Sequence, residues 1–177
     1  AFQLTAQGSI SEIYSPPRIV PHAERAGFTP GWSLDLTTND ENGQPYDFSK
    51  HECRDKARKL VHKTKPLLLV GSPMCTWFSV LQNLNKKQPN HKEKMKAHLD
   101  MTRKLLSGFA QLADAVILRN GHLAFEWPVD NRYWHMPEVV ALIGLPLGWT
   151  EARATGCAFG LKVVGGDRNG LYMEKHW

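Results

Sequence analysis

Hydrophobic and polar positions alternate with two different periods along the chain, and the change of period separates expected strands from expected helices. Short alternating or continuous apolar runs predict strands at 9–15, 31–36, 66–73, 122–128 and 150–161. Helix signals lie between them and predict helices at 16–28, 49–65, 95–116 and 136–144.

Two of the expected helices have specific signals. Ser49 is followed three residues later by Glu52, a spacing typical of a capping box at a helix start. The later helix has apolar or small residues at alternating spacings of four and three, which predicts one buried face: Met95, Leu99, Thr102, Leu106, Phe109, Ala113 and Val116.

Strands that alternate with helices predict an α/β fold with a mostly parallel central sheet. The 177 residues suit a single domain, 1–177, with a sizeable core. Ligands of such sheets bind beyond the carboxyl ends of the strands. Three unusual sequences fall at expected strand ends, namely "YSPPR", "GSPMC" and "FEWP".

Composition narrows the protein class only slightly. Three cysteines without a CxxC pair favour a reducing intracellular compartment over a disulfide framework, and no apolar run is long enough to span a membrane. The net charge of +5 favours a polyanionic partner, although basic runs are most often solvated surfaces. Candidate phosphate contacts lie in the basic run 86–98: Lys86, Lys87, Lys92 and Lys94.

Cys75 and Glu126 are the strongest candidates for chemistry. A thiolate and a carboxylate at neighbouring strand ends suit covalent activation of an electron-poor ring, because the thiolate adds while the acid engages a ring nitrogen. The alternatives stay open: Cys75 as a small buried hydrophobic residue and Glu126 as a salt-bridged or edge-exposed acid. Asp35 ends the second strand, where an acid can bind ribose hydroxyls or form a turn with Thr37 and Thr38.

The order of these motifs resembles the catalytic core of the DNA (cytosine-5) methyltransferases. The matching segments are "AERAGF" before an acid-bearing strand, "SPMCTWFS", "FEWP" and "CAFGL". The combination of "SPPR", "GSPMC" and "FEWP" also resembles divergent methyltransferase-like reading frames within retroelement polyproteins. The resemblance implies a Rossmann-like methyltransferase fold, with Cys75 attacking carbon 6 of a flipped-out cytosine and Glu126 engaging ring N3.

The resemblance also implies S-adenosylmethionine as cofactor and nucleic acid as substrate. The residues that contact the cofactor would then be Tyr14, Ser15, Pro16, Asp35, Leu36 and Pro73. The chain differs from the family pattern in its "YSPPRIV" loop, which has two prolines and no glycine, and the given sequence ends at Trp177, before the place where the family has a target-recognition region. The chain is therefore interpreted as a methyltransferase-like domain, which is either a whole protein or a fragment of a larger one. The alternative function is a non-catalytic module that binds nucleic acid or a protein partner. A different enzyme class that uses the Cys75 thiolate ranks last, because no histidine spacing selects a base.

Overall fold

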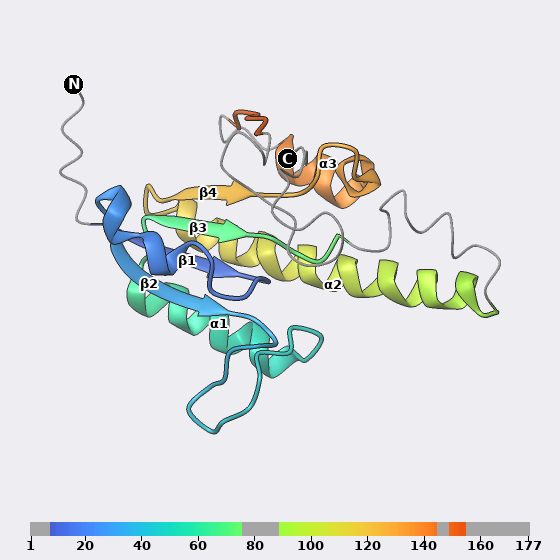
Figure 1. Cartoon of the computed structure of the whole chain (residues 1–177), viewed down its shortest axis with the longest axis horizontal. Helices are drawn as coiled ribbons and strands as arrows, with labels where there is room; N and C mark the ends of the chain where they lie inside the picture. Colours follow the sequence, from blue (N-terminus) through green and yellow to red (C-terminus); the bar gives the residue numbers. More distant parts are fainter. Residues whose placement is uncertain (1–7, 76–88, 145–148, 155–177) are drawn as a thin grey trace, which may run out of the picture.

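Four parallel strands form the centre of the protein in the order β2-β1-β3-β4. The structure, a computed structural model, describes residues 8–75, 89–144 and 149–154. In Figure 1 the strands lie side by side with their arrowheads toward the same edge. Their bounds are β1 Ser9–Ile13, β2 Thr29–Leu34, β3 Leu68–Gly71 and β4 His122–Phe125.

The two long helices pack on one face of this sheet (Figure 1). Helix α1 (His51–Thr64) connects β2 to β3, and α2 (His91–Ile117) connects β3 to β4. The connection from β1 to β2 runs in the opposite direction across the sheet. Because crossovers between parallel strands are right-handed, its two short 3-10 turns, η1 (Val20–His22) and η2 (Glu24–Ala26), cover the other face.

Alternation along the strands builds a core on each face. Ile13 and Leu69 point toward the helices and are completely buried with Phe109 of α2. Ile10 and Val70 point to the opposite face and pack against Ala23, between the two 3-10 turns. A further 3-10 turn, η5 (Arg132–His135), and helix α3 (Pro137–Ile143) follow β4, and Figure 1 shows α3 beyond the arrowhead of that strand.

The expected α/β class and mostly parallel sheet are confirmed. The expected apolar face of the long helix is also confirmed, since Thr102, Leu106, Phe109, Ala113 and Val116 are buried and Met95 and Leu99 half-buried. The second strand begins two residues earlier than expected, and Pro30 is tolerated there because β2 is an edge strand.

Two expectations of local structure are wrong, and a third is described only in part. The segment 16–28 contains two 3-10 turns and no α-helix, because three prolines and a buried carboxylate fix its backbone in another path. The capping box does not form: Lys50 is the N-cap of α1, without a side-chain cap. Residues 150–154 of the last expected strand contain no strand, and its remainder lies outside the described residues.

Candidate site at the carboxyl ends of the strands

The chain leaves the carboxyl ends of β1 and β3 in opposite directions across the sheet. β1 connects to β2 on one side, whereas β3 connects to β4 on the other. In open α/β sheets the crevice at such a reversal is the usual ligand site. A ligand site is therefore expected at the residues that follow β1, β3 and β4.

Glu12 of β1 organises the loop that starts this crevice. Its side chain is only 1% exposed, yet both carboxylate oxygens have donors. The backbone N–H groups of Arg18, Ile19 and Val20 donate to it over 3.0–3.2 Å. The Ser33 hydroxyl donates from β2 at 2.8 Å. The carboxylate thus holds the loop with the protein's own groups.

Tyr14 and Ser15 point into the protein. The Tyr14 hydroxyl donates to the carbonyl of Leu105 in α2 at 2.8 Å, and its ring lies edge-on to Phe48. Burial raises the pKa of Tyr14 strongly, although the positive charge of Arg54 opposes the shift. The Ser15 hydroxyl is within hydrogen-bond distance of Glu12 Oε2, 3.2 Å, and of the Pro16 carbonyl, 3.1 Å. These side chains serve the loop and the core.

The backbone of Tyr14 takes the conformation that glycine favours. Its φ is 68°, in the left-handed region, where a side chain is strained. The chain therefore makes a sharp turn at the end of β1 without glycine, and Pro16 follows half-buried in that turn.

Asp35 directly follows β2 and forms the turn with Thr37 that was the alternative to ribose binding. Its Oδ1 accepts hydrogen bonds from both the N–H and the hydroxyl of Thr37, each at 3.0 Å. The Asp35 N–H donates to the Thr38 hydroxyl at 2.8 Å. The neighbouring Leu36 is 57% exposed and presents an apolar side chain to solvent. A carboxylate and an apolar surface therefore lie together at this strand end.

The ends of β3 and β4 are tied to each other. Gly71 pairs with Phe125, and the Glu126 N–H donates to the Gly71 carbonyl at 3.1 Å. Farther along, the Trp127 indole donates to the carbonyl of buried Pro73 at 2.7 Å. The Asn131 amide reaches the Cys75 carbonyl at 3.4 Å. Successive links thus hold the segments that carry Cys75 and Glu126 next to each other.

The two candidate side chains face different surroundings. Glu126 is exposed and lines a cavity of about 650 Å³ whose other walls include Trp134, Trp149 and Arg153. Cys75 is half-buried against the apolar cluster of Trp127, Tyr133 and their neighbours. The segments that carry the two residues are linked, but the thiol does not line this cavity.

Trp127 and Trp134 pack in the protein. Trp127 is 2% exposed, and its ring lies 5.3 Å from that of Trp134 and 4.7 Å from that of Phe125. Burial raises the pKa of Tyr133 in the same cluster. The rings therefore support the strand ends that carry the candidate residues.

The expected phosphate contacts are only partly described. Lys92 and Lys94 are exposed in the first turn of α2. Lys86 and Lys87 lie outside the described residues.

Sequence patterns missed Glu12, the most elaborately bonded carboxylate at this edge. The only signal was an acid between the apolar residues of a short strand.

No family model, curated protein or solved structure matches this chain. In the described ranges, no group of three metal-ligating side chains is close enough to hold an ion. A search of the same residues finds no helix with the length and apolar character needed to cross a membrane.

Proposed function

We propose that the chain is a methyltransferase-like domain that acts on a cytosine base of nucleic acid through Cys75 and Glu126. The observation that carries the proposal is the pairing of β3 with β4, which brings the segments with a thiol and a carboxylate to the same edge of a parallel sheet. The order of the strands supports it further, because this edge contains the reversal at which α/β proteins bind ligands.

The two side chains suit addition to a pyrimidine ring. The Cys75 thiolate forms a bond to carbon 6 while Glu126 donates a proton to ring N3, so that the electron pair of the carbon 5–carbon 6 bond becomes available at carbon 5. After substitution at carbon 5, loss of the proton there, cleavage of the sulfur–carbon 6 bond and return of the N3 proton to Glu126 restore the ring, the thiolate and the acid. The Glu126 carboxylate is exposed, as its role requires, whereas Cys75 is half-buried and does not line the cavity that Glu126 borders.

S-Adenosylmethionine fits the expected residues in part. Asp35 and the exposed Leu36 suit the ribose and adenine, and Pro16 and Pro73 follow β1 and β3 at the same edge of the sheet. Tyr14 and Ser15 fit only through their backbone, because their side chains are bonded within the protein. When bound, this cofactor supplies an electrophilic methyl group for carbon 5.

A non-catalytic module that binds nucleic acid is the second candidate. The observation that favours it is Glu12, whose carboxylate already occupies the loop N–H groups that could approach a cofactor. This candidate predicts no affinity for the cofactor and full nucleic-acid binding by a Cys75→Ser protein.

Calorimetric titration and covalent trapping separate the two candidates. The purified chain is titrated with S-adenosylmethionine and with its demethylated product, in parallel with Asp35→Ala. It is then incubated with the cofactor and a 5-fluorocytosine oligonucleotide. Micromolar binding that weakens in Asp35→Ala, with an adduct that is absent in Cys75→Ser, would support the enzyme. A folded sample that binds neither compound and forms no adduct would exclude the methyltransferase mechanism for this chain.

A further inference from the structure

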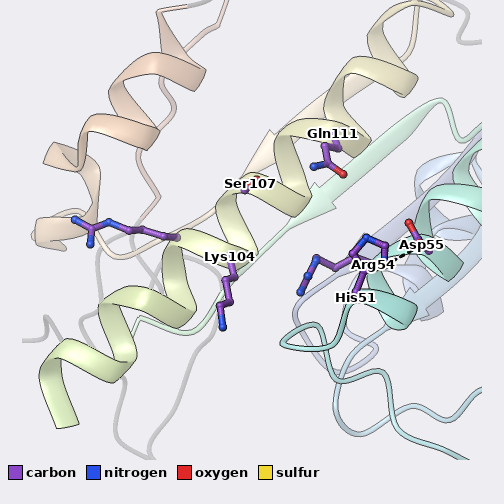
Figure 2. A pocket seen from close by; sticks show the side chains of 7 residues that line it. His51, Arg54, Asp55, Lys104, Ser107 and Gln111 are labelled. Carbon is purple, nitrogen blue, oxygen red and sulfur yellow. Dashed lines mark ion pairs between the residues drawn. The ribbon is translucent and has the colours of Figure 1, made fainter. Parts of the chain in front are cut away.

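A second concave site lies between α1 and α2, on the helical face of the sheet. Its volume is about 330 Å³, and its walls come from the first half of α1 and the middle of α2: His51, Arg54, Asp55, Arg103, Lys104, Ser107 and Gln111. We call it the α1–α2 cleft. Figure 2 shows Arg54 and Lys104 extending from opposite helices into the space between them.

Arg54 is held in place by the protein. Both hydrogen atoms of its NH1 group have acceptors, the carbonyls of Phe48 at 2.7 Å and Ser49 at 2.9 Å. The aliphatic part of the Arg54 side chain lies against α2 at Gly108. A Cβ atom added to Gly108 would lie only 3.1 Å from Arg54 Cδ. Within the described ranges, Nε and NH2 have no acceptor. Arg54 therefore presents its planar two-donor edge, which matches the oxygens of a phosphate group.

The charges of the cleft favour an anion. Arg103 is neutralised by Glu138 of α3 at 2.8 Å and by Asp100 at 3.6 Å. Asp55, the one carboxylate of the wall, pairs with His51 at 3.0 Å and with Arg58 at 2.7 Å. Lys104 is exposed and forms no ion pair in the part of the chain that the structure describes. Arg54 and Lys104 thus supply the positive charge that the wall leaves uncompensated, and Ser107 and Gln111 add neutral polar groups.

We propose that the α1–α2 cleft binds a backbone phosphate of a nucleic-acid strand, with Arg54 as a two-donor contact and Lys104 as a point charge. The identification of the bound polymer as nucleic acid rests on the proposed function. The cleft binds no base edge, so it contributes affinity and orientation without sequence preference.

Salt-dependent binding of labelled oligonucleotides tests this proposal. The probes are a fluorescein-labelled single strand of mixed sequence and its duplex, with fluorescence anisotropy as the readout. Lys104→Gln should weaken binding about fivefold at physiological salt and reduce the salt slope by about 1, because one fewer counter-ion is released. Lys63→Gln is the matched control: it removes the same charge about 14 Å farther along α1 than Arg54.

Arg54→Lys separates geometry from charge. It keeps the positive charge and loses the two-donor edge, so affinity should fall while the salt slope changes little. Thermal melting of this variant shows whether its fold survives the loss of the bonds to Phe48 and Ser49, and Lys104→Gln does not depend on those bonds. Equal effects of Lys104→Gln and Lys63→Gln, or no effect of either, would overturn the proposal.

Two more measurements identify the source of the phosphate and isolate this proposal from the catalytic one. Calorimetric binding of inorganic phosphate that Lys104→Gln abolishes, with unchanged oligonucleotide affinity, would overturn the assignment to a nucleic-acid strand. Cys75 trapping is measured on the same proteins. An adduct without any Lys104 effect overturns only the cleft, whereas a Lys104 effect without an adduct overturns only the catalytic mechanism and supports the cleft.

Discussion

The hydroxyl of Ser33 donates a hydrogen bond of 2.8 Å to the buried carboxylate of Glu12, and this bond joins β2 to β1 just before the candidate site begins. The same carboxylate accepts three backbone N–H groups of the loop after β1. One acidic side chain therefore sets both the pairing of two strands and the path of the loop that borders the crevice.

Glu12→Gln should lower the free energy of unfolding by about 3 kcal/mol, because an amide directs its own N–H groups toward donors and leaves buried groups unpaired. Urea unfolding measures the change. Glu24→Gln is the control, since Glu24 is exposed in η2 and its substitution should leave the stability nearly unchanged. Equal stabilities of the two variants would show that the Glu12 bonds contribute nothing specific.

The contact between Asp40, in the loop after β2, and Lys56 of α1 should weaken in acid. The hydrogen bond from Lys56, with those from the Gln44 and Asn42 N–H groups, lowers the pKa of Asp40 below its ordinary value of 3.8. A lowered carboxyl pKa adds stability above the unfolded value, and this part is lost as the pH falls below 3.8 through the folded value. Lys56→Gln should reduce that acid dependence, measured by urea unfolding across the acid range. An unchanged pH profile would contradict the argument.

Tyr14 should contribute to unfolding in alkali. Burial raises its pKa above the ordinary value of 10.0, so the folded protein retains a phenol proton that the unfolded chain releases. The contribution of Tyr14 to the stability is fully present below pH 10.0 and is lost as the pH rises toward the pKa of Tyr14 in the folded protein. Tyr14→Phe should cost about 1 kcal/mol at neutral pH, through the bond to Leu105, yet reduce the alkaline loss. An alkaline profile parallel to that of the wild type would refute this assignment.

The sequence indicates the fold because periodicity depends on burial. The repeat in α2 and the apolar run of β3 report which faces are covered, and both elements occur where they are expected. The segment 16–28 is different, because its path is set by a carboxylate on β1 that lies several residues away in the chain. Local propensity contains no information on such a bond.

The sequence predicts which residues reach the site but not the direction of their side chains. Parallel strands bring Cys75 and Glu126 to one edge, and this follows from the strand order alone. Side-chain direction does not follow from it: Tyr14 and Ser15 turn inward, Asp35 forms a turn with Thr37, and Glu126 lines a cavity that the thiol does not reach. The α1–α2 cleft also escapes detection, since its two cationic groups are fifty positions apart in the sequence, Arg54 and Lys104.

Trp127 should control the reactivity of Cys75. Its buried indole donates to the Pro73 carbonyl, two residues before the thiol, and its ring belongs to the cluster on which Cys75 packs. Trp127→Phe removes the donor and leaves a gap, so we expect a loss of about 3 kcal/mol in stability and faster reaction of Cys75 with a disulfide reagent. The measurement uses a Cys53→Ser, Cys157→Ser background, in which Cys75 is the only thiol. Trp149→Phe also removes an indole donor, to the Leu142 carbonyl, but lies outside that cluster and should leave the thiol rate unchanged. If both variants accelerate the reaction equally, general loosening of the fold explains the effect, and Trp127 does not position the thiol.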